Sequence, residues 1–124
     1  MFSLPHFSKS VLHAWHGLVR VAREEQSFRI QLLAGIAVAV LMSVLDLSGL
    51  ERAFLVLAIT LVLVLELVNS IFERVADLMK PRIHQYVADI KDIMAAAVLV
   101  ASIGAAIIGI LIILPHLGIG PSGR

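Results

Sequence analysis

The chain has 124 residues, of which 60% are hydrophobic, and its ten Lys and Arg nearly balance its nine Asp and Glu. Soluble domains have about 45–50% apolar residues, so we predict a single-domain integral membrane protein over residues 1–124. The net charge of +1 argues against a nucleic-acid partner, and the absence of cysteine excludes disulfides, zinc–thiolate sites and thiol nucleophiles.

The N-terminal segment predicts an amphipathic helix over residues 5–28 that lies on a membrane surface. A tryptophan at Trp15 suits the headgroup layer. The alternative is a helix packed on protein, and the segment lacks the basic start and unbroken apolar core of a signal peptide. Apolar residues recur at spacings of three and four: Phe7, Val11, Trp15, Leu18 and Ala22.

Three apolar stretches follow, and each is expected to cross the membrane as a helix. The first covers residues 30–50, the second covers 53–77 with a cytoplasmic extension, and the third covers 90–114. None shows the period-two alternation of barrel strands. The expected fold is therefore all-α, with three transmembrane helices and one surface helix. Small residues repeat along the third stretch and would let helices approach closely: Ala97, Ala101, Ala105 and Gly109.

Basic residues gather before the first span and between the second and third spans. Cytoplasmic segments near membrane spans carry an excess of Lys and Arg. We therefore expect the N-terminus and the segment between spans two and three to lie in the cytoplasm, and the C-terminus to lie outside.

The stretch LELVNSIFERVAD, from Leu65 to Asp77, carries carboxylates inside and at the end of an apolar run. A helix advances about 100° per residue, which places its polar residues in one sector of roughly 100°. A lone carboxylate at Glu66 would cost a few kcal/mol in lipid, so it must be protonated, paired or exposed to a wet cavity. A polar helix–helix contact is the simplest alternative, but one amide would serve that purpose. The polar residues are Glu66, Asn69, Ser70, Glu73 and Asp77.

Acids and an amide at the cytoplasmic edge suit Mg²⁺, which prefers carboxylate oxygens and shares its ligand shell with phosphates and water. A carboxylate held out of water can act as a general base. Together they suit phosphoryl transfer to a lipid hydroxyl, which depends mainly on positioning and charge neutralisation. The sequence contains no P-loop and no kinase glycine-rich loop, so any nucleotide site is of another kind.

Four stretches resemble the small prokaryotic membrane lipid kinases, the diacylglycerol and undecaprenol kinases. They are WHGL at 15–18, EEQSFR at 24–29, ELVNSIFERVAD at 66–77 and IKDIMAAAVL at 90–99. The resemblance implies a homotrimeric bundle in the bacterial plasma membrane, with active sites shared between neighbouring subunits. It also implies ATP as phosphate donor with Mg²⁺, and a membrane lipid alcohol as acceptor.

The resemblance also implies roles for individual residues. Glu66 matches the general base, and Glu25 and Glu73 match the metal-binding acids. The matching positions also indicate residues that contact substrate or nucleotide: Asn69, Lys91, Asp92, His84, Arg29, Trp15 and Gly17.

Two departures concern the acceptor. The diacylglycerol branch tends to carry an acid where this chain has Gln31 and a serine where it has Ala95. The runs FRIQ and DIMAAAVL are closer to the undecaprenol branch, which favours undecaprenol while both acceptors remain open. The alternative to a kinase is a non-enzymatic membrane scaffold or assembly subunit whose polar stripe only packs helices. An ion relay is a further alternative, although a transmembrane path would need polar groups throughout the spans.

Overall fold

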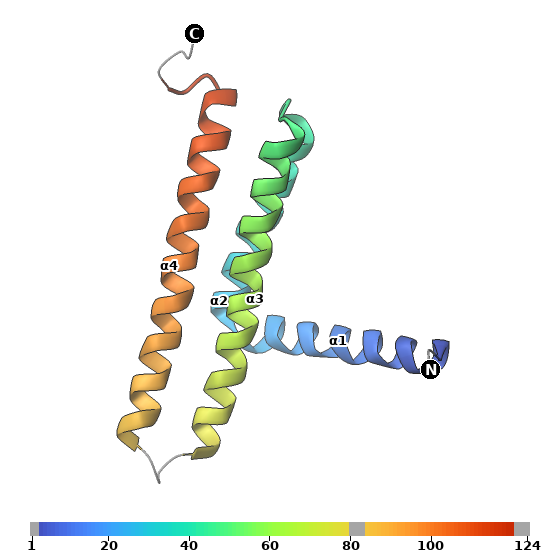
Figure 1. The fold of residues 1–124 in the computed structure, drawn as a ribbon, viewed down its shortest axis with the longest axis vertical. Helices are drawn as coiled ribbons and strands as arrows, with labels where there is room; N and C mark the ends of the chain where they lie inside the picture. The colour runs from blue at the N-terminus through green and yellow to red at the C-terminus, as the bar shows by residue number, and fades with distance from the viewer. Residues whose placement is uncertain (1–2, 80–83, 121–124) are drawn as a thin grey trace.

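The computed structural model describes residues 3–79 and 84–120, and these residues form four helices without any strand (Figure 1). The helices are α1 (Leu4–Glu24), α2 (Gln26–Val44), α3 (Gly49–Met79) and α4 (His84–His116). Three of them, α2, α3 and α4, are long and apolar enough to cross a membrane. The predicted all-α membrane class with three spans and one further helix is therefore confirmed.

Helix α1 projects at a steep angle from the other three, which run alongside one another (Figure 1). None of its residues is buried, and large apolar side chains such as Phe7 and Trp15 are more than half exposed. A helix that is amphipathic and has an unburied apolar face suits a membrane surface. Helices α3 and α4 continue beyond the level of α1, on the side away from the C-terminus (Figure 1).

The first helix ends four residues before the expected boundary at residue 28, because the chain turns at Glu25. The backbone of Glu25 is extended, with φ −106° and ψ 111°, and α2 begins at the next residue. The Arg29 guanidinium donates hydrogen bonds to the carbonyl oxygens of Ala22, at 3.1 Å, and Arg23, at 2.8 Å. A cationic side chain that satisfies the last carbonyls stabilises a helix C-terminus. Residues expected on the surface helix therefore begin the first span.

The turn between α2 and α3 is held by reciprocal caps. The Ser48 hydroxyl accepts a hydrogen bond from the Glu51 backbone N–H at 3.2 Å, and the Ser48 N–H donates to the Glu51 carboxylate at 2.8 Å. This is a capping box, which satisfies donors that a helix start leaves unpaired. Arg52 donates to the carbonyl oxygens of Leu45 and Leu47. The first span therefore ends at Val44, six residues before the expected boundary.

Helix α3 packs against both α4 and α2. Its buried residues lie at helical spacing along one side: Leu55, Ala58, Val62, Glu66, Ser70 and Ala76. The tightest glycine contact joins α2 to α3, where a methyl group added at Gly35 would lie 3.0 Å from the Ile59 side chain. A methyl group added at Gly109 would meet no atom within 4 Å. Within the described chain no helix approaches Gly109 closely, and Gly109 lines an apolar groove of about 400 Å³ between α2, α3 and α4, so the close approach expected there remains a prediction.

Candidate functional site

The polar stripe of α3 passes the joint between α1 and α2. Glu66 is 4% exposed and Ser70 is 2% exposed, whereas Asn69 and Glu73 are half-buried and Asp77 is exposed. The fold therefore encloses the first acid of the stripe and leaves the last one in solvent, while the course of the stripe from lipid to cytoplasm remains a prediction. The stripe therefore links the buried side of α3 with its exposed end.

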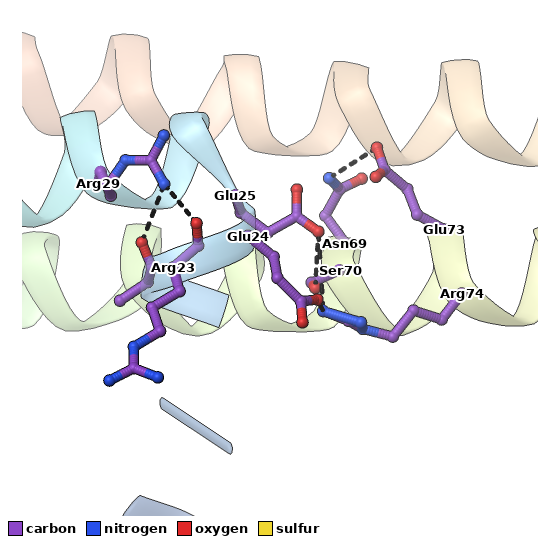
Figure 2. Close-up of polar contacts among 9 residues, drawn as sticks. Arg23, Glu24, Glu25, Arg29, Asn69, Ser70, Glu73 and Arg74 are labelled. Carbon is purple, nitrogen blue, oxygen red and sulfur yellow. Dashed lines mark hydrogen bonds and ion pairs between the residues drawn. The ribbon is translucent and has the colours of Figure 1, made fainter. Parts of the chain in front are cut away.

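Glu25 approaches the stripe from the α1–α2 joint. Its Oε1 accepts a hydrogen bond from the Ser70 hydroxyl at 3.2 Å (Figure 2). The extended backbone at Glu25 interrupts the helix, so its side chain leaves the joint at a position where α2 packs against α3. Residues 45 positions apart in the sequence thus lie in direct contact.

The buried Glu66 carboxyl lies among other acids. Ser27 lies beside it, and the negative charges of Glu25 and Glu73 act on it electrostatically. Like charges at short range in a poorly solvated site repel one another strongly. A cation placed between these acids would relieve that repulsion, which is the electrostatic condition for a metal or phosphate-bound metal site.

Asn69 and Glu73 form a second contact along the stripe. The Asn69 amide donates to Glu73 Oε1 at 3.5 Å, at the long limit for a hydrogen bond (Figure 2). The two residues are one helical turn apart, which is the spacing at which helix side chains meet. Asn69 can therefore orient the Glu73 carboxylate while both remain half-exposed.

Lys91 brings a positive charge from α4 to the exposed end of the stripe. Its Nζ lies 2.8 Å from Asp77 Oδ1. The neighbouring Asp92 is exposed on α4. The structure thus places Lys91 at the end of the acidic stripe, where a lysine can meet phosphate as a point charge.

Four other candidate residues lie apart from this cluster. Trp15 is 62% exposed and Gly17 has open space around it on α1. Arg29 uses its guanidinium to hold the end of α1, as described above. His84 is the first residue of α4, and its side chain lies outside the described part of the chain. The roles assigned to these four residues remain predictions.

The candidate metal ligands fit Mg²⁺ by donor chemistry. Among residues 3–79 and 84–120, no group of three His, Asp or Glu side chains is close enough to hold a metal alone. Mg²⁺ is usually held by one or two carboxylates together with phosphates and waters, so a three-residue cage is not required. Glu25 and Glu73 supply two carboxylates near Glu66, and Asn69 supplies an amide.

The structure adds residues that the sequence pattern did not assign to the site. Arg74 forms an ion pair with Glu24 at 2.7 Å and lies 3.9 Å from Glu25, and Ser27 lies beside Glu66. Arg74 is four residues after Ser70, so helical spacing already places both on one side of α3. The residues of the α1–α2 joint that Ser70 and Arg74 contact depend on how the helices pack. The spacing of residues within α3 does not indicate them.

Comparisons with known proteins agree with this arrangement. Residues 12–113 match the model of the family described as prokaryotic diacylglycerol kinase. The chain is 38% identical over 114 residues to a diacylglycerol kinase of Synechocystis sp., covering 91% of this chain and 65% of that protein. It is 36% identical to an undecaprenol kinase of Bacillus subtilis, covering 92% and 93%, and 31% identical to a diacylglycerol kinase of Escherichia coli, covering 89% and 90%.

The match extends over all three apolar helices and most of α1, and it includes the acids at the α1–α2 joint and along α3. These identities extend over at least nine-tenths of the length of the Bacillus and Escherichia relatives. The chain belongs to the prokaryotic diacylglycerol kinase family.

Proposed function

We propose that the protein is an ATP-dependent lipid kinase that transfers the γ-phosphoryl group of ATP to the primary hydroxyl of a membrane lipid alcohol. The observation that carries this proposal is the buried Glu66, which lies beside Glu25 and Glu73 where the surface helix joins the first span. An acid at this place can reach a hydroxyl at the membrane boundary. The names of the relatives, diacylglycerol kinase and undecaprenol kinase, support the same reaction class.

In the proposed reaction Glu66 acts as the general base. Its carboxylate takes the proton of the acceptor hydroxyl as the acceptor oxygen bonds to the γ-phosphorus. The bond from that phosphorus to the ADP oxygen breaks, and the products are ADP and a phosphorylated lipid. A positioned base of this kind typically contributes about 10²–10⁴-fold to the rate.

Glu25 and Glu73 are the proposed metal ligands, supported by Asn69. Bound Mg²⁺ would neutralise charge on the ATP phosphates and help to align them. Lys91 is proposed to meet a phosphate oxygen together with its neighbour Asp92, and its ion pair with Asp77 at the exposed end of the stripe supports this. Arg29, Trp15, Gly17 and His84 are retained as proposed contacts to lipid or nucleotide.

The acceptor is proposed to be undecaprenol or diacylglycerol. Both present a primary hydroxyl beside long apolar chains, so the same acids can serve either reaction. The relatives carry both names at similar identity, 38% and 36%. Gln31 and Ala95 favour undecaprenol, because they replace the acid and the serine of the diacylglycerol branch.

We further propose a homotrimer in the bacterial plasma membrane. The N-terminus and the segment between α3 and α4 would lie in the cytoplasm, as the basic residues indicate, and the C-terminus would lie outside. The exposed apolar residues of the spans leave ample surface for lipid or for neighbouring subunits. ATP, the lipid alcohol and bulk membrane lipids are the proposed partners.

The test is an assay of purified protein with MgATP and with diacylglycerol and undecaprenol offered side by side in detergent micelles. Phosphorylation of either lipid supports the kinase, and the ratio of kcat/KM values identifies the acceptor. Failure to phosphorylate both would favour the non-enzymatic scaffold. In that case, the double variant Glu66→Gln, Glu73→Gln should differ from the wild type in subunit assembly, and neither protein should show kinase activity.

A further inference from the structure

Arg74 is a cation placed against two consecutive acids of the α1–α2 joint. Its Nη2 lies 2.7 Å from Glu24 Oε2 and 3.9 Å from Glu25 Oε1. Figure 2 shows the guanidinium reaching from α3 toward both side chains. The contacts connect the exposed side of α3 to the joint from which Glu25 enters the site.

The ion pair with Glu24 is too exposed to matter greatly for stability. The Arg74 and Glu24 side chains are 42% and 53% exposed, and pairs of this kind contribute little to stability. Arg74 can instead affect the position of the Glu25 carboxylate. Glu25 is half-buried, and its Oε1 already accepts the Ser70 hydrogen bond. Ser70 and Arg74 are one turn apart, so α3 presents a hydroxyl and a guanidinium to the same carboxylate oxygen.

Glu25 needs such restraint because of its neighbour Glu66. The Glu66 carboxyl interacts electrostatically with Glu25, and two like charges repel each other. Without an opposing positive charge, the Glu25 side chain would favour rotamers that turn away from Glu66. Both α3 contacts engage Oε1 and neither engages Oε2, so a restrained carboxylate offers its second oxygen to a ligand.

We propose that Arg74, anchored by Glu24, is a positioning residue that holds Glu25 in the orientation that binds the metal. This inference rests on the proposed function, since it takes Glu25 as a metal ligand. Arg74 acts through Glu25 and does not touch the reacting atoms. The alternative is that the Arg74 guanidinium competes with the metal for Glu25. In that case Arg74 would weaken metal binding.

The experiment compares Arg74→Gln, Arg74→Lys and Glu24→Gln in the full-length detergent-solubilised protein. Arg23→Gln is the matched control, because it removes one positive charge next to the joint and its side chain points away from the acids in Figure 2. The first readout is Mn²⁺ affinity in the presence of a non-hydrolysable ATP analogue, measured by electron paramagnetic resonance. The second is the Mg²⁺ concentration that gives half-maximal lipid phosphorylation, and the third is the thermal unfolding midpoint.

Arg74→Gln should weaken Mn²⁺ binding and raise the half-saturating Mg²⁺ concentration by about threefold to tenfold, toward the weak end of the coupling measured between groups in one polar network. KM for the lipid and the unfolding midpoint should stay near the wild-type values. Arg74→Lys should recover part of the affinity, since it keeps the charge without the planar fork. Glu24→Gln should act in the same direction, and the double variant should be little worse than Arg74→Gln. Arg23→Gln should resemble the wild type.

Unchanged Mn²⁺ binding in Arg74→Gln would overturn the proposal. Tighter Mn²⁺ binding would also overturn it and would show that Arg74 competes with the metal. An equal loss of Mn²⁺ affinity in Arg23→Gln would show that the effect depends only on the net charge near the joint. If the wild type bound no Mn²⁺, the proposed metal site would not exist. Failure of the kinase proposal is distinguishable. If the wild type phosphorylates no lipid but binds Mn²⁺, and Arg74→Gln weakens that binding, Arg74 still positions a cation ligand.

Discussion

The Ser70 hydroxyl donates a hydrogen bond to Glu25 Oε1 at 3.2 Å, joining the middle of α3 to the turn between α1 and α2. Ser70 is 2% exposed, so few rotamers are open to its side chain. The contact gives Glu25 a fixed neighbour on the helix that also carries Glu66 and Glu73. The site thus depends on a serine that has no proposed chemical role of its own.

Ser70→Ala should reduce the turnover of the proposed reaction about twofold to tenfold, the range expected when a hydrogen bond worth about 0.5–1.5 kcal/mol is lost. Ser70→Thr keeps the hydroxyl and should retain more activity. Steady-state kinetics against Mg²⁺ would check this, since the loss should appear in the Mg²⁺ dependence. Ser43→Ala, which removes an exposed hydroxyl bonded only to the Val40 carbonyl of its own helix, is the control. Equal activity of Ser70→Ala and wild type would show that Glu25 needs no anchor on α3.

Glu66→Gln should lower kcat by about 10²–10⁴-fold, because the amide keeps the shape of the side chain but cannot accept the proton. The protein should remain folded, since the substitution removes a buried negative charge that lies near two others. Binding of an ATP analogue, measured by calorimetry, should persist. Asp46→Asn removes an exposed acid at the far end of α2 and should leave kcat unchanged. Full activity of Glu66→Gln would remove the general-base assignment.

The polar stripe could be predicted from the sequence because it depends on one helix. Residue spacing alone orders Glu66, Ser70 and Asp77 along one face, and the structure buries the first two and exposes the third. The three spans were predictable for a similar reason, since length and apolar composition decide them. The division into a single domain and the roles of the site residues remain predictions.

The boundaries and the partners across helices could not be predicted in this way. The surface helix ends at Glu24 because Arg29 folds back onto the Ala22 and Arg23 carbonyls, and sequence spacing does not reveal that contact. The sequence indicates only that Arg74 is one of the basic residues that follow the second span, and its acids lie 50 and 49 positions away. Contacts of this kind depend on how two helices are rotated about their axes, which a single apolar pattern leaves undetermined.

Two variants can separate the structural role of Lys91 from its proposed role in phosphate binding. It forms an ion pair with Asp77 at 2.8 Å, and the Asp77 side chain is 63% exposed, so loss of the pair alone should change stability little. Lys91→Met should raise KM for ATP and lower kcat if the ammonium meets a phosphate. Asp77→Asn, which breaks the same pair but keeps the lysine, should change both constants less than about fivefold, an exposed pair being worth about 0–1 kcal/mol. Equal effects of the two variants would assign Lys91 to the ion pair only.

Two glycines test where the spans pack closely. Gly35→Ala would place a methyl group 3.0 Å from the Ile59 side chain, and a β-branched residue in a helix has little rotamer freedom to move away. Gly109→Ala would meet no atom within 4 Å. Both variants gain the same helix propensity, so their difference reports the crowding at Gly35, expected to be about 1–3 kcal/mol in favour of Gly109→Ala. Unfolding midpoints in mixed micelles measure this difference directly. The reverse order would mean that α4 approaches another helix more closely than α2 approaches α3, as could occur between the subunits of the proposed trimer.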